Sequence, residues 1–200
     1  MRGEIFITFN RELLYLWINF NNQFIMEALR KNAANLGLFL GLTMILLTTV
    51  AYAVDLNLFT KWWFGTITMA SVVVFGCISA VRNKRNAGGF LSFKETFTSF
   101  IITAVVGLFI STLYSLVLLN VIDPEAKNVI TENVIKYTVD MMQGFGAKPS
   151  DINKMVEEMK NTDNFGPAGQ LKGFLWNIVI YSIVGLIASL IIRRERPQSI

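Results

Sequence analysis

The sequence predicts an all-α membrane protein with four transmembrane helices, and three observations support this. Hydrophobic residues make up 53% of the 200 residues. Charged residues make up only 16%, whereas a soluble domain carries about 25%. The charges are also segregated, which leaves uncharged runs of roughly the 20 residues that cross about 30 Å of hydrocarbon. We place the spans at about 36–54, 62–81, 96–122 and 173–192.

Residues 1–25 differ from the rest of the chain. Asn19, Asn21 and Asn22 follow an apolar stretch there, and no helical period is clear. Met26 opens a charged segment just before the first span, as at the start of a membrane protein. We therefore expect 1–25 to be a non-native extension or a disordered segment, and 26–200 to form a single four-helix transmembrane domain.

The first span, 36–54, has two interpretations. A basic segment precedes its apolar stretch, and the sequence Ala51-Tyr-Ala resembles a signal-peptidase site. Cleavage there would leave three spans. However, Gly37 and Gly41 form a GxxxG pair, which packs helices together in membranes and is not needed by a discarded peptide. We favour a retained helix, and both interpretations predict the same orientation for the remaining spans.

The second span, 62–81, opens with Trp62 and Trp63, which we expect to anchor it at headgroup level. A basic turn ending in Gly88-Gly89 then breaks the chain. The third span carries a small residue at every fourth position. Steps of four advance about 40° around a helix, so this stripe winds slowly and predicts a helix–helix contact. Alternatively, the hydroxyls bond to their own helix carbonyls. The stripe consists of Ser99, Thr103, Gly107, Ser111 and Ser115.

The segment 123–172 is predicted to hold two short amphipathic helices. Asp123-Pro-Glu is a helix start, with a capping Asp and Pro at the first helical position. Apolar residues follow at helical spacing, at Ile130, Val134, Tyr137 and Met141. Ser150-Asp begins the second helix, which carries Ile152, Met155, Val156 and Met159. The apolar faces must be buried against each other, the bilayer or a partner.

The fourth span, 173–192, offers Gly185 and Ser189 for helix packing. Lysine and arginine residues gather at its end, before the first span, and between the second and third spans, whereas Lys61 alone lies between the first and second. By the positive-inside rule, both termini are cytoplasmic and the loop 123–172 is external. The expected cytoplasmic basic anchors are Arg82, Lys84, Arg85, Arg193, Arg194 and Arg196.

Composition argues against several classes of site. The chain has no histidine, the commonest general base and a common metal ligand. Its one cysteine, Cys77, lies inside the second span, where it is best explained as a small hydrophobe. The net charge of +4 reflects basic residues at span ends rather than a nucleic-acid surface. We therefore expect no catalytic residue, no metal, no cofactor and no nucleic-acid partner.

The sequence from Arg85 to Phe97, Arg-Asn-Ala-Gly-Gly-Phe-Leu-Ser-Phe-Lys-Glu-Thr-Phe, resembles a bacterial membrane family catalogued as domain of unknown function 4199. The Asp123-Pro end of the third span and the Met-containing helix at 150–159 are also similar. The resemblance covers about 27–196. It implies four spans in a bacterial cytoplasmic (inner) membrane, and it brings no activity and no functional residues.

The sequence favours a non-catalytic membrane assembly or accessory protein, which contacts the lipid bilayer and either a second copy of itself or another membrane protein. The alternative is a small transporter or a lipid-handling protein. None of the four spans contains Asp, Glu, Lys, Arg or Pro, which argues against proton coupling. An enzyme is the third hypothesis. Its candidates are the carboxylates of 123–172, and Asp123 and Asp151 among them are better explained as helix starts.

Overall fold

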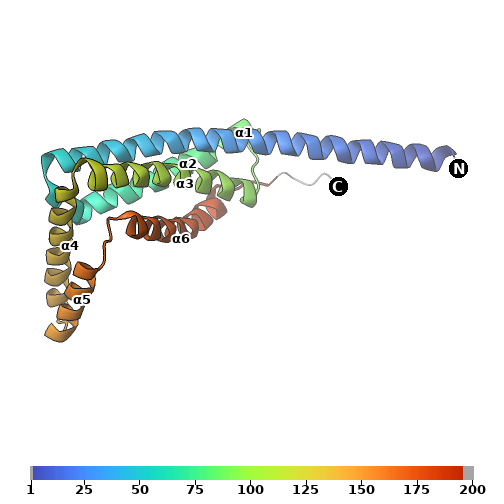
Figure 1. Ribbon diagram of the computed structural model, residues 1–200. Coiled ribbons are helices and arrows are strands. Elements are labelled where there is room, and N and C mark those ends of the chain that lie inside the picture. The colour runs from blue at the N-terminus through green and yellow to red at the C-terminus, as the bar shows by residue number, and fades with distance from the viewer. Residues whose placement is uncertain (1, 196–200) are drawn as a thin grey trace.

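The computed structural model describes the backbone of residues 2–195 and the side chains of residues 26–195. Helices account for nearly all of it, joined by short turns (Figure 1). In chain order the elements are α1 (Arg2–Val54), η1 (Leu56–Thr60), α2 (Trp62–Asn86), α3 (Phe93–Val117), η2 (Leu118–Ile122), α4 (Pro124–Gly144), α5 (Pro149–Asn161) and α6 (Pro167–Ile192).

Four helical segments are long and apolar enough to cross a membrane, which confirms the predicted all-α class and suggests a multi-pass membrane protein. Each segment has one boundary beyond the predicted apolar run, because flanking polar and charged residues continue the helix. The segments are Met26–Val54, Trp62–Asn86, Phe93–Ile122 and Pro167–Ile192. Figure 1 shows α1 extending well beyond the other helices at its N-terminal end. The predictions for 1–25 stay predictions, since the side chains there lie outside the described residues.

The helix α3 lies at the centre of the bundle, in contact with α1, α2 and α6. Its N-terminus is fixed by a capping box, in which the Ser92 hydroxyl accepts from the Glu95 N–H at 3.3 Å and the Glu95 carboxylate accepts from the Ser92 N–H at 2.8 Å. The main apolar core forms around it. The buried residues of this core are Leu40, Met44, Val72, Phe100, Ala104 and Tyr181.

The helix α3 ends in a widened π-helical turn, η2. The Asp123 N–H donates to the Leu118 carbonyl at 2.8 Å, five residues back. This turn buries Leu118 and Leu119 against Ala126 and Ile130 of α4, which forms a second apolar cluster at this end of the bundle. The chain is thereby redirected from the bundle axis into α4.

The helices α4 and α5 run across the bundle axis, at the end where α1 stops and α6 begins (Figure 1). The Asp123 carboxylate accepts from the Ala126 N–H at 3.0 Å, and Pro124 occupies the first turn of α4. The helix α5 begins at Pro149, one residue before the predicted start at Ser150, because the fixed φ of proline suits a first helical position. The external position of these helices stays a prediction.

We predict that Gly107→Leu destabilises the bundle. A Cβ at Gly107 would lie 2.5 Å from Leu40 Cγ and 2.9 Å from Leu40 Cβ, and Leu40 is fully buried, so α1 and α3 must separate. Lipid offers no compensating apolar drive. The melting temperature in one detergent should fall clearly, whereas Leu113→Ala on the same helix, where the side chain is 47% exposed, should change it little. Equal melting temperatures for both variants and the wild type would refute this packing.

Candidate functional site

A buried amide joins α1, α2 and α3 at one end of the bundle. Asn83 of α2 is fully buried, and its Nδ2 donates to the Leu29 carbonyl at 3.1 Å and to Ser99 Oγ at 2.8 Å. Its Oδ1 accepts from Asn32 Nδ2 at 2.5 Å. Both amide protons and the amide oxygen of Asn83 are therefore satisfied inside the bundle. Satisfied polar groups of this kind are the ones that membrane interiors tolerate.

The hydroxyls of α3 extend this contact along the helix. Thr103 is fully buried and donates to the Ala33 carbonyl of α1 at 2.9 Å, as well as to the Ser99 carbonyl of its own helix at 3.0 Å. Ser79 of α2 donates to that same Ser99 carbonyl at 3.3 Å. Both interpretations of the α3 stripe thus describe part of the structure, because the hydroxyls bond within the helix and also across to its neighbours.

Glycines bring α1 and α3 close together. A Cβ at Gly37 would lie 2.6 Å from Val106 Cβ, and one at Gly41 would lie 2.8 Å from Ile110 Cβ. Gly107 of α3 in turn faces Leu40 of α1. The contact is therefore reciprocal, since each helix places side chains over the glycines of the other.

Phe100 links α3 to the remaining two spans. Its ring is fully buried, and it lies over Gly76 of α2 on one side and Gly185 of α6 on the other. A Cβ would come within 2.5 Å of the ring at Gly76 and 2.7 Å at Gly185. Ser189, one turn further along α6, is buried and donates to the Gly185 carbonyl at 2.6 Å.

The far end of the predicted stripe behaves differently. Ser111 is half-buried, and Ser115 accepts from Gln170 of α6 at 3.2 Å. The structure therefore brings Ser99, Thr103 and Gly107 into the interior, but it brings Ser115 to α6 rather than to α1.

At the end of the bundle where Arg82, Lys84, Arg85 and Arg194 lie, which we call the basic end, the α2–α3 turn pairs through its backbone with the segment after α6. The Leu91 and Arg194 backbones exchange two hydrogen bonds, of 2.8 and 2.9 Å. Lys84 donates to the Ile192 carbonyl at 2.6 Å and so caps the end of α6. The Arg194 guanidinium lies 5.4 Å from the centroid of the Phe90 ring.

The other predicted basic anchors take less part in this contact. Arg82 and Arg85 are exposed on α2. Arg193 forms an exposed ion pair with Glu195 at 3.3 Å. Arg196 lies outside the described residues.

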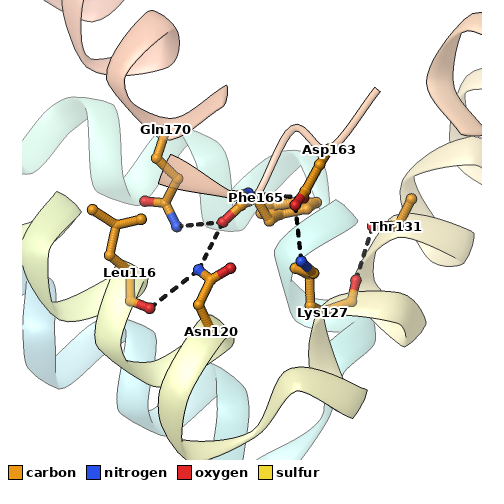
Figure 2. A network of polar contacts seen from close by, with 8 residues as sticks. Leu116, Asn120, Lys127, Thr131, Asp163, Phe165 and Gln170 are labelled. Atoms are coloured by element: carbon orange, nitrogen blue, oxygen red, sulfur yellow. Dashed lines mark hydrogen bonds and ion pairs between the residues drawn. The ribbon is translucent and has the colours of Figure 1, made fainter. Parts of the chain in front are cut away.

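A polar network holds the base of the α4–α5 arm, by which we mean residues 124–161, against the bundle (Figure 2). Asn120 donates to the Phe165 carbonyl at 3.0 Å, and Gln170 donates to the same carbonyl at 3.2 Å. Lys127 of α4 pairs with Asp163 at 3.0 Å, just before α6. Both ends of the arm are thus tied to the same end of the bundle.

Hydrogen bonds at this base lower the pKa values of two carboxyl groups. The Lys127 ammonium lowers the pKa of Asp163, although partial desolvation opposes the shift. The Ala126 N–H, followed by the Tyr52 hydroxyl, lowers the pKa of Asp123. A lowered folded-state pKa stabilises the fold above the usual carboxyl range, and this stabilisation is lost as the pH falls through the lowered pKa. Both contacts are therefore present at neutral pH.

A shallow apolar groove of about 490 Å³ runs along the first half of α6. Lys172 provides the charged group on its wall, and the other lining residues are Ala168, Leu171, Leu175, Trp176 and Val179. Leu171, Leu175, Trp176 and Val179 are all exposed. Among the side chains of residues 26–195, no three His, Cys, Asp or Glu gather closely enough to hold a metal ion.

A family model described as "Protein of unknown function (DUF4199)" matches residues 35–194, which is most of the chain. The chain belongs to DUF4199. The resemblance carried by 85–97 is therefore confirmed at the level of the family. No curated protein matches this DUF4199 chain. No solved structure matches it either.

Sequence reasoning missed two central residues of this DUF4199 bundle. Asn83 stands between Arg82 and Lys84, so it reads as part of a solvated basic turn. Phe100 is one of 16 phenylalanines. The sequence signal for this contact was a small residue on each of two other helices, Gly76 on α2 and Gly185 on α6. Small residues indicate that something packs closely against them, but they do not say which side chain it is.

We predict that Asn83→Leu destabilises the bundle by about 1–2 kcal/mol, because it leaves the half-buried Asn32 amide without its acceptor and removes an interhelical bond. The matched control is Asn86→Leu, at an exposed position on the same helix. Thermal unfolding in one detergent measures both. In a double-mutant cycle, Asn32→Ala should cost less in the Asn83→Leu background than in the wild type. Additive costs would show that the two amides do not interact.

Proposed function

We propose that this chain is a non-catalytic assembly or accessory protein of a membrane, which acts by binding another membrane protein or a second copy of itself. The main support is how the bundle uses its polar groups. The Asn83 amide, the Thr103 hydroxyl and the Ser79 hydroxyl all hydrogen-bond to neighbouring helices. The interior polar groups therefore serve packing, which leaves the outer surfaces for recognition.

We further propose a bacterial cytoplasmic membrane, with both termini in the cytoplasm and the arm outside. The α2–α3 turn and the end of α6 meet at one end of the bundle, where Arg82, Lys84, Arg85 and Arg194 gather. Such clusters favour the cytoplasmic side. The first span is proposed to be retained rather than cleaved, because Gly37 and Gly41 lie against α3.

A lipid-handling protein is the second candidate, and the groove on α6 favours it. Its lining is apolar apart from Lys172, and it lies beside the exposed Trp176 ring. Indole rings settle at the headgroup level of a bilayer, so the Lys172 ammonium would lie near lipid phosphates. An acyl chain against the groove and a phosphate at Lys172 would suit this geometry.

Co-purification in mild detergent tests these two functions against each other. We expect a protein, either a second copy or another membrane protein, to be retained reproducibly with the wild type. Lys172→Ala should leave that protein bound. A stoichiometric lipid that is lost in Lys172→Ala, with no protein retained, would instead establish the lipid-handling alternative. Turnover of a substrate by the isolated chain would contradict the non-catalytic proposal.

Reporter fusions test the orientation. A reporter active only in the cytoplasm should be inactive when inserted at Gly146, in the turn between α4 and α5, and active at the C-terminus. Gly146 is exposed and has a positive φ of 74°, so the turn there is open to insertion. An export-dependent reporter at the two positions serves as the control and should give the opposite pattern. Cytoplasmic activity at Gly146 would overturn the proposed topology.

A further inference from the structure

We propose that the α4–α5 arm lies on the bilayer surface, with Tyr137 and Met141 of α4 in contact with lipid beside the bundle. The inference goes beyond the assembly function, because it assigns a membrane-surface site to a segment outside the four spans. It rests on one premise of that function, that the spans cross a bilayer.

The first argument is the direction of the arm. The helices of the bundle share one axis, and α4 crosses it at the end of α3 (Figure 1). If the spans cross a bilayer, the bundle axis lies near the membrane normal. A helix that crosses this axis at the end of a span therefore runs along the bilayer surface, as interfacial helices do.

The second argument is the continuity of one helical face. Near the start of α4, Ile130 is 1% exposed and packs against Leu118 and Leu119 at the end of the bundle. Tyr137 and Met141 lie 7 and 11 residues further along α4. At 100° per residue, both positions fall within about 20° of the direction of Ile130. They are nevertheless 46% and 44% exposed. The face that covers the bundle end therefore continues beyond the edge of the bundle, where lipid would surround the spans.

The third argument is the charge on the other side of α4. Glu132, Lys136 and Asp140 are all exposed. Their positions on the helix are roughly 80–160° away from the Ile130 direction. The helix thus presents an apolar face on the side of Ile130, and the charged positions run from its flank at Asp140 to the opposite side at Glu132. Phe145, at the end of α4, is 86% exposed and extends the apolar surface to the tip of the arm.

The fourth argument is that the base of the arm is fixed. The Tyr52 hydroxyl donates to the Asp123 carboxylate at 2.8 Å, where the chain enters α4. Lys127 pairs with Asp163 at 3.0 Å, where the chain leaves α5 for α6. These contacts set the rotation of α4 relative to the bundle, so the direction of Tyr137 and Met141 follows from the direction of Ile130.

Spin labels on the full chain test the proposal. Cys77 is the only cysteine, so Cys77→Ala provides the background. Nitroxides are attached at Tyr137→Cys, at Met141→Cys and, as the matched control on the charged face, at Lys136→Cys. The protein is reconstituted in vesicles of phosphatidylethanolamine and phosphatidylglycerol. Collision with oxygen, which concentrates in lipid, is compared with collision with a water-soluble nickel chelate.

We expect the labels at 137 and 141 to collide with oxygen more than with nickel, and their nickel collision rate to be several-fold lower than that of the label at 136. Nickel collision equal to that at 136 would overturn the proposal, because the face would be in water. Shielding from both reagents would also overturn it, because a protein would cover the face. A label at Ile183→Cys, where the side chain is 57% exposed on α6, tests the premise separately. If that label is in water, the membrane function itself fails.

Discussion

The fold depends on the close approach of three helices to α3, because apolar burial alone does not hold helices together in lipid. Tight packing and interhelical hydrogen bonds must supply the stability. Phe100 meets the first requirement, since its ring fills the space over Gly76 and Gly185 and so joins α2 and α6 to α3. Asn83 and Thr103 meet the second, with bonds to α1 and to α3 itself. Larger side chains at these glycines would move the helices apart and lengthen the hydrogen bonds as well.

The two ends of the bundle follow from this arrangement in different ways. At the basic end, α2 and α3 are joined by a short turn whose two glycines, Gly88 and Gly89, have positive φ values of 75° and 89°. The turn can then pair through Leu91 with the segment that follows α6. At the other end, α3 does not pass directly into the next span. The π-helical turn at η2 redirects the chain into α4, and the network around Phe165 returns it to α6. One end is a compact closure, and the other carries the arm.

The spans could be predicted because their evidence is local: uncharged runs of sufficient length do not depend on which helices meet. The packing was predictable only in part. Ser99, Thr103 and Gly107 lie inside the bundle, but the stripe turns about 40° with each step, so Ser115 has left the α1 side and faces Gln170. The buried position of Asn83 could not be predicted, because its hydrogen-bond partner, the Leu29 carbonyl, belongs to another helix. Its basic neighbours in the sequence instead suggest a solvated turn. Phe100 was hidden for the same reason, since its partners lie on two other helices.

The hydrogen bonding of the interior also distinguishes surfaces that can bind a ligand or lipid from those that cannot. A polar group that is already bonded inside the bundle, such as the fully buried Asn83 amide, has both of its N–H donors in use and is out of reach of a ligand. Any ligand must therefore bind at side chains that are exposed on the surface of the bundle or the arm. On the described residues, two exposed surfaces lie near the end of the bundle that carries the arm, namely the α6 groove beside Lys172 and the Tyr137–Met141 face of α4, which we assign to lipid. Both surfaces are linked to the polar network at the base of the arm. Gln170 lies on α6, as the groove does, and Lys127 lies on α4, as Tyr137 and Met141 do. A movement of α4 on the bilayer surface would strain the Lys127–Asp163 pair, and Asp163 also accepts from the Gly166 N–H at the start of α6. The position of the arm and the packing of the last span are therefore physically connected.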